Sequence, residues 1–110
     1  LYLAHPGRAD FIKRDELQDL FGMAADPIGI AKVEIMLDHQ VVAEAGPLKD
    51  DPNVHAPAFF AYDPNYPNIQ FNYSVPADKV TPGEHTLSML ATRSDGTQVE
   101  GSQRLIYVKP

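Results

Sequence analysis

The chain has 110 residues, a length that fits one domain and leaves no room for two. Hydrophobic residues make up 44% and charged residues 22%, so composition argues against a disordered, collagen-like or coiled-coil chain. Nine basic against fifteen acidic residues give a net charge of -6, and we therefore expect no nucleic-acid partner. The absence of cysteine excludes disulfides, thiolate catalysis and cysteine-based zinc sites. The longest apolar runs span only a few residues, so we expect no membrane insertion.

The N-terminal quarter allows two interpretations. Leu17, Leu20 and Phe21 have helical spacing, and Gly22 could end such a helix. The same stretch can also form a strand over residues 19–24, which we favour because the rest of the chain is rich in strand and turn signals. We interpret residues 1–16 as an N-terminal arm or linker, whose structure could be strand, helix or linker. We interpret residues 17–110 as the folded domain.

Alternating apolar residues predict strands along most of the chain. In residues 31–37, Val33, Ile35 and Leu37 share one face, which is the period of a half-buried strand. The same alternation predicts further strands over residues 41–45, 70–75, 85–92 and 99–108. We expect the core to contain Val33, Ile35, Leu37, Phe71, Leu87 and Met89.

Tight turns separate these strands. The turn after residue 37 has no glycine, so Asp38 or His39 must tolerate a positive φ, which Asp and His do more often than most residues. Residues 81–84 (Thr-Pro-Gly-Glu) and 94–97 (Ser-Asp-Gly-Thr) are glycine turns. Short alternating strands separated by such turns predict an all-β fold. We expect an Ig-like β-sandwich of about seven antiparallel strands with a long loop rich in proline and aromatic residues.

That loop is the segment 46–69, which has little periodicity and holds half of the ten prolines. A long segment of this kind in a small domain is often functional. Its aromatic side chains are the candidate binding residues, Phe59, Phe60, Tyr62 and Tyr66. Two interpretations stay open: the rings fold back as a lid over an open end of the sandwich, or they form a surface for a ligand or partner.

Several short motifs resemble the bacterial Ig-like domains, in which the patterns v-x-G-W-A-x-D, G-I-x-x-V-E-V-x-x-D-G, P-G-x-H-T-L, A-x-D and a D-x-x-G-like ending occur in this order. The matching segments are Phe21–Asp26, Gly29–Asp38, Pro82–Leu87, Ala91–Thr92 and Asp95–Gly96. One branch of these domains carries a Pro-rich insert, which resembles Asp51–Val54, Phe60, Tyr66–Asn68 and Phe71. The resemblance covers about residues 17–108. It departs at Met23, where Trp is usual, at His39, where Gly is usual, and at Arg93, where an acidic residue often stands.

The resemblance implies a non-catalytic accessory or spacer module of a larger bacterial protein that is exported or associated with the cell envelope. Such modules are often attached to enzymes acting on carbohydrate or cell-envelope polymers. The location it implies is periplasmic, cell-surface or secreted, and the first partner is a neighbouring domain of the same polypeptide. The beginning at Leu1 and the end after a strand-like run also suggest a processed chain or an excised module.

Candidate chemistry is sparse. The four histidines lack the spacing of a metal pair within one element, so we expect no metal site from His5, His39, His55 and His85. Oxygen-bearing side chains in the long loop could suit calcium, but no calcium-loop motif is present, and we interpret them as turn residues: Asp50, Asp51, Asn53, Asp63, Asn65 and Asn68. No nucleophile motif or phosphate loop is present, so we expect no catalysis and no cofactor. The alternative to a spacer is a carbohydrate- or protein-binding module that uses the 46–69 loop.

Overall fold

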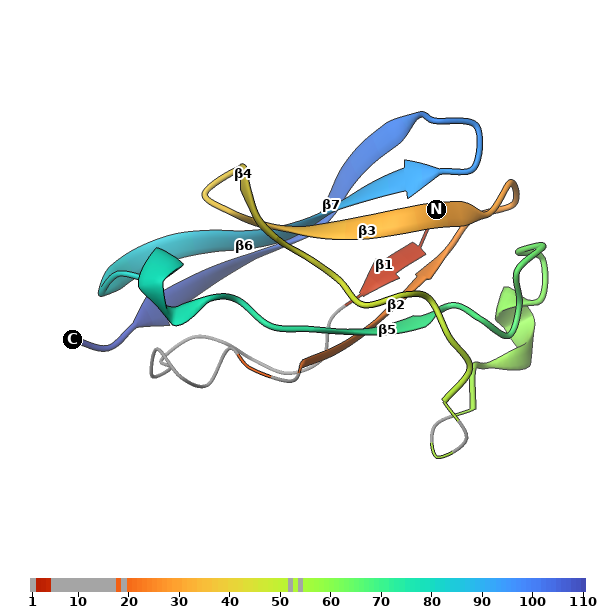
Figure 1. The fold of residues 1–110 in the computed structure, drawn as a ribbon, viewed down its shortest axis with the longest axis horizontal. Helices are drawn as coiled ribbons and strands as arrows, with labels where there is room; N and C mark the ends of the chain where they lie inside the picture. The colour runs from red at the N-terminus through yellow and green to blue at the C-terminus, as the bar shows by residue number, and fades with distance from the viewer. Residues whose placement is uncertain (1, 5–17, 19, 52, 54) are drawn as a thin grey trace.

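The computed structural model describes residues 2–4, 18, 20–51, 53 and 55–110, which form two antiparallel sheets packed face to face (Figure 1). The three-stranded sheet has the order β1 (Tyr2–Ala4), β2 (Leu20–Ala25) and β5 (Gln70–Tyr73). The four-stranded sheet has the order β4 (Gln40–Glu44), β3 (Ile30–Leu37), β6 (Gly83–Arg93) and β7 (Gln98–Val108). Two short 3-10 helices are η2 (Ala58–Phe60) and η3 (Ala77–Lys79). The expected all-β, Ig-like sandwich of antiparallel strands is therefore confirmed.

The N-terminal quarter forms strand rather than helix where the structure describes it. β2 pairs with β5 through Gly22 and Phe71, and with β1 through Ala25 and Tyr2. β1 falls within the segment 1–16 that we interpreted as an arm or linker, and its backbone belongs to the sheet. The rest of that arm, and Leu17 with its alternative helical spacing, lie outside the described residues.

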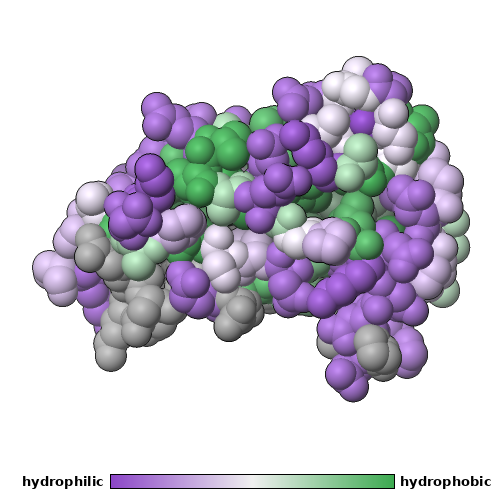
Figure 2. Space-filling model, in the orientation of Figure 1, coloured by the Kyte–Doolittle hydropathy of each residue, from purple (hydrophilic) through white to green (hydrophobic). Residues whose placement is uncertain are grey.

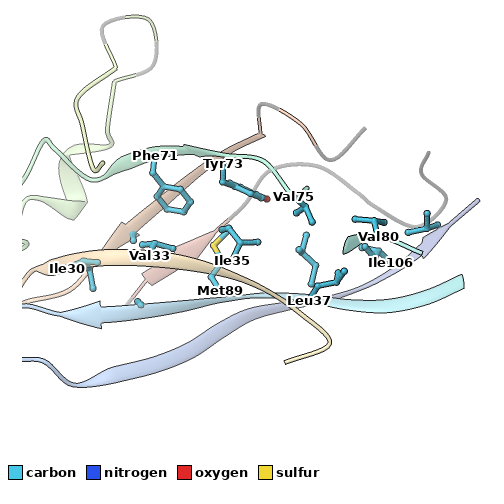
Figure 3. Packing of buried hydrophobic residues seen from close by; sticks show 14 residues of the cluster. Ile30, Val33, Ile35, Leu37, Phe71, Tyr73, Val75, Val80, Met89 and Ile106 are labelled. Atoms are coloured by element: carbon cyan, nitrogen blue, oxygen red, sulfur yellow. The ribbon is translucent and has the colours of Figure 1, made fainter. Parts of the chain in front are cut away.

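The core lies between the two sheets. Figure 3 shows Phe71, Tyr73 and Val75 on one layer pointing toward Ile35 and Met89 on the other. All six residues that the alternation places in the core are buried. The period-2 pattern locates the core because consecutive strand side chains point to opposite faces, and one face of each sheet meets the other sheet. Burial extends beyond that face, because Met36 and Ser88, which pair on the opposite face of β3 and β6, are buried too.

The predicted turns form with the expected backbone conformations. Both residues of the glycine-free turn have positive φ, 53° at Asp38 and 66° at His39. The Asp38 carboxylate stabilises this turn, because its Oδ1 accepts a hydrogen bond of 2.9 Å from the Thr86 N–H on β6. Gly83 and Gly96 also have positive φ, 116° and 90°.

After β4 the chain crosses from one sheet to the other (Figure 1). The N–H of Ala45 still donates to Val33 of β3 (2.9 Å), whereas the N–H of Gly46 donates to Asn72 of β5 (2.8 Å). Lys49 then exchanges two backbone hydrogen bonds with β5. This crossing closes one edge of the sandwich and delivers the long loop to the three-stranded sheet.

Replacing Leu87 by alanine should lower the free energy of unfolding by about 2–5 kcal/mol, because the side chain is 1% exposed and its removal leaves a cavity. The matched control is Leu105→Ala on the neighbouring strand, where leucine is 59% exposed and the loss should stay within about 0.5 kcal/mol. Urea unfolding of both variants measures the difference. Equal losses in the two variants would show that the register between β6 and β7 is wrong.

Candidate functional site

Three connections meet at one end of the sandwich, here called the loop end. It consists of residues 26–29, 58–68 and 93–97 (Figure 1). The Ser94 N–H donates to the Gly29 carbonyl oxygen (3.0 Å), and the Asp26 N–H donates to Oδ2 of Asp63 (2.9 Å). These bonds tie the turn between β2 and β3 to both of the other segments, so the loop end is one connected unit.

The four predicted aromatic residues fall into two pairs. Phe60 is 4% exposed, and it packs with Ala25 in a second, smaller apolar cluster. Tyr66 packs against the same cluster, and its hydroxyl donates to the Ala56 carbonyl oxygen (2.7 Å). Phe59 and Tyr62, in contrast, are 73% and 47% exposed. The structure therefore brings all four into one segment but leaves only two of them available to a ligand.

The exposed rings do not form a level platform with the buried one. The Phe59 and Phe60 ring centroids are 4.3 Å apart with an angle of 50° between the planes. Phe60 and Tyr62 lie 6.4 Å apart in an edge arrangement at 61°. Phe60 thus contacts both exposed rings, and its edge arrangement with Tyr62 is a favourable aromatic geometry.

Asp63 clamps the loop end through backbone groups. Its side chain is buried, with Oδ2 accepting from the Asp26 N–H (2.9 Å) and Oδ1 accepting from the Asn65 N–H (2.7 Å). Buried carboxylates are tolerated when hydrogen bonds satisfy them. Asp63, which the sequence grouped with possible calcium ligands, therefore serves to hold the aromatic segment against β2.

Asp26 and Arg93 form a second link across the loop end. Arg93 Nε donates to Oδ2 of Asp26 (2.9 Å), and the Ile28 N–H donates to Oδ1 (3.1 Å). Burial alone would raise the pKa of Asp26, but these hydrogen bonds and the guanidinium charge outweigh it and hold the pKa below its usual value. Arg93, a departure from the Ig-like pattern, thus has a structural partner 67 positions away in the sequence.

Metal ligands do not gather in the described part of the chain. Within it, no three histidine or acidic side chains are close enough together to hold a metal ion. His5 lies outside the described residues. No helix among those described is long and apolar enough to cross a membrane.

A groove of about 380 Å³ opens between the loop end and residues 45–49, here called the crossing segment. It is lined by Ile30, Ala31, Pro47, Leu48, Asn65 and Asn68. Its accessible lining is more polar than apolar: Pro47 and Leu48 contribute the apolar side chains of the crossing segment, and Asn65 and Asn68 contribute two amides from the loop. The face drawn in Figure 2 has the same mixed character, with hydrophobic atoms reaching the surface between hydrophilic side chains.

The two amides of the groove are exposed to solvent. No described residue forms a hydrogen bond with the side-chain amide of Asn65 or Asn68. Asn65 sits beside Gly29, whose φ of +85° and missing side chain make room for it, since a Cβ there would lie 3.0 Å from Nδ2. In the sequence both asparagines read as turn residues, and no local pattern places them at one site.

At the opposite end of β6, a histidine holds two turns together. Nδ1 of His85 lies 2.6 Å from Oδ2 of Asp38, and Nε2 lies 2.7 Å from the Thr81 carbonyl oxygen. The Asp38 carboxylate and the Thr81 carbonyl are both acceptors, an arrangement that favours the doubly protonated imidazole, and the Thr81 hydroxyl lies 3.2 Å from Nε2. The hydrogen bond to Asp38 raises the pKa of His85 above its usual value despite partial burial. Burial alone would raise the pKa of Asp38, but its hydrogen bonds lower it.

A third polar cluster joins β6, β7 and the turn after β3. The Glu100 carboxylate accepts from the buried Ser88 hydroxyl (2.8 Å) and lies 2.7 Å from Nδ1 of His39, through the same oxygen. The carboxylate stands between hydroxyl and imidazole. These contacts join β6 and β7 to the turn after β3 across the strands.

No known protein family and no curated protein matches this chain. Two solved structures are similar in fold. The fibronectin(III)-like modules of CbhA from Clostridium thermocellum match with 15% identity and a TM-score of 0.57, over 98% of this chain and 97% of that chain. CopC from Methylosinus trichosporium OB3b matches with 16% identity and a TM-score of 0.47, over 100% of this chain and 91% of that chain. At these identities the likeness concerns the fold, and the first match supports the Ig-like β-sandwich.

Stability should depend on pH through the His85–Asp38 pair. A histidine with a raised pKa stabilises the fold below its unfolded value of about 6.5, and this contribution is lost as pH rises through the folded pKa. Because the pKa of Asp38 is lowered, Asp38 stabilises the fold above its unfolded pKa of about 3.8. This stabilisation is lost as pH falls through the folded pKa. The difference in Tm between wild type and His85→Gln should therefore be larger at about pH 5.5 than at about pH 9.

Thermal unfolding followed by circular dichroism measures this difference. The control is His55→Gln, since His55 is exposed and its substitution should give no such pH dependence. A Tm difference for His85→Gln that stays constant across this range would contradict a charged imidazole.

Proposed function

We propose that this domain is a non-catalytic Ig-like accessory or spacer module of a larger bacterial exported or envelope-associated protein. The observation that carries the proposal is that the clustered polar side chains form hydrogen bonds within the domain itself. Asp63, Asp26 and His85 each bond to backbone groups of the domain itself or to a partner that does so. Their chemistry serves to fix turns and strand ends rather than a substrate.

The path of the chain supports the spacer role. Tyr2 of β1 pairs with Ala25, next to the loop end, whereas Val108 of β7 pairs with Gly83 at the other end of β6. The described chain therefore enters and leaves the sandwich at opposite ends, as a spacer between neighbouring domains requires. The similarity in fold to modules of CbhA supports the same role.

The partner in this proposal is a neighbouring domain of the same polypeptide, and the location is periplasmic, cell-surface or secreted. These assignments follow the resemblance to bacterial Ig-like domains.

A second candidate function is carbohydrate or protein binding through the exposed rings. Phe59 and Tyr62 favour it, because exposed aromatic side chains on an anchored loop lose little entropy on binding. The buried Phe60 and the partly buried Tyr66 would act as support for this surface.

A spacer should keep a fixed distance between its two ends. Nitroxide labels at Ile28→Cys and Lys109→Cys are specific because the natural chain has no cysteine, and both positions are exposed. Pulsed electron spin resonance should give one narrow distance distribution, near the length of β6, about 35 Å. A broad or two-peaked distribution would contradict a spacer.

The binding candidate predicts retention of the chain on an array of bacterial envelope glycans. Phe59→Ala and Tyr62→Ala should abolish retention while leaving Tm nearly unchanged, because these rings are exposed. Phe60→Ala is the structural control and should lose about 3 kcal/mol of stability. Retention that survives both exposed-ring substitutions would exclude these rings as the binding surface, and absence of retention leaves the spacer role alone.

A further inference from the structure

We propose that the groove between the crossing segment and the loop end binds one neutral, hydroxylated ring, a single sugar residue of a glycan. This site goes beyond the spacer function, and it does not involve Phe59 or Tyr62. Its six lining residues come from three separate parts of the chain, namely β3, the crossing segment and the loop.

The size of this open groove fits such a ligand. The volume of about 380 Å³ lies at the lower end of the range for small-molecule sites, which suits one ring rather than an extended chain. Pro47 and Leu48 offer an apolar wall, and Ile30 connects that wall to the core. A sugar ring would place its C–H groups against this wall.

The amides give the second half of the recognition. The side chains of Asn65 and Asn68 each offer a donor and an acceptor, and neither has a hydrogen bond to a described residue. Each hydroxyl is likewise donor and acceptor, so amide and hydroxyl are complementary in either direction. Asp63 in the same loop differs from both asparagines, because each of its carboxylate oxygens accepts a backbone hydrogen bond that stabilises the fold.

Charge decides between ligand classes. The six residues that line the groove include no ionisable side chain, and the chain as a whole has a net charge of -6. An anionic ligand would meet no cation in the groove and a repulsive field around it. A neutral sugar is therefore favoured over uronic acids or phosphates.

The walls are held in place before any ligand binds. The Asn68 N–H donates to the Asn65 carbonyl oxygen (2.8 Å), and Asp63 holds the Asn65 N–H. On the other side, the register between β3 and β6 shifts between Ile30 and Lys32, so Ala31 is an extra residue in the ladder. Bulges of this kind re-aim side chains at strand ends, and a fixed site avoids the cost of ordering a loop on binding.

The test is a nuclear magnetic resonance titration of the whole chain. The probes are tetramers of glucose and of N-acetylglucosamine, the two monosaccharides, and tetragalacturonate as the charged control. We expect the side-chain amide signals of Asn65 and Asn68 to shift with the neutral sugars, at concentrations up to about 20 mM. Similar affinity for monosaccharide and tetramer would identify a free sugar as sufficient, whereas a tighter tetramer points to a glycan.

Variants locate the site. Asn68→Ala should weaken binding about fivefold, the effect of one net hydrogen bond. Ala31→Phe should abolish binding by filling the groove, while an exposed strand position accepts the larger side chain without unfolding. The matched control is Asn72→Ala, an exposed asparagine on β5 that is absent from the groove lining, which should bind as wild type does.

Several results would overturn the proposal. They are no amide shift with any neutral sugar in the folded chain, binding that Ala31→Phe leaves intact, and a stronger response to tetragalacturonate. Shifts confined to Phe59 and Tyr62 would also overturn it in favour of the exposed rings. A response of the groove amides to an unrelated extended peptide but to no sugar would replace the glycan by a protein partner. None of these results changes the spacer proposal, which depends on the distance between the two ends.

Discussion

After β4 the chain changes sheets, and this change is the constraint on which the rest of the structure depends. The N–H of Ala45 bonds to β3, and the N–H of Gly46 bonds to β5. Two consecutive N–H groups bond to opposite sheets, so the sandwich is closed along this edge by backbone hydrogen bonds. The same step turns Pro47 and Leu48 into a wall of the groove. It also starts the long loop on the three-stranded sheet, which puts Phe60 within reach of Ala25.

The polar side chains of the two ends fall into two groups, those that form hydrogen bonds within the protein and those that do not. A buried polar group costs free energy unless it is hydrogen-bonded, and Asp26, Asp63 and His85 meet this demand with backbone partners or with an arginine. Each joins parts of the chain that are far apart in sequence, so they fix the geometry of the two ends. Asn65 and Asn68 are exposed, so solvent can satisfy their amides, and no described residue forms a hydrogen bond with either amide.

The sequence predicts the sheets better than the loop for a physical reason. Alternation in residues 31–37 records which face is buried, and the conformation of Asp38 and His39 follows from the short turn. Phe59 and Phe60 are identical side chains at neighbouring positions without periodicity. Their opposite burial is decided by η2 and by contacts with Ala25, which lies far away in sequence. The groove and the Arg93–Asp26 ion pair likewise arise from contacts between residues far apart in sequence, which no local pattern predicts.

The expected weak affinity of the groove for a sugar connects the groove proposal to the spacer proposal. A site for one sugar residue with two amides should bind in the millimolar range, which is too weak to hold a free domain on a polymer. Tethering changes this, because a second weak contact on the same polypeptide acts at an effective concentration in the millimolar range. A rigid body that keeps such a site at a fixed distance from its neighbour would therefore add avidity without slowing the neighbour's release. In the proposed function, the fixed ends and the weak neutral site are two parts of one role.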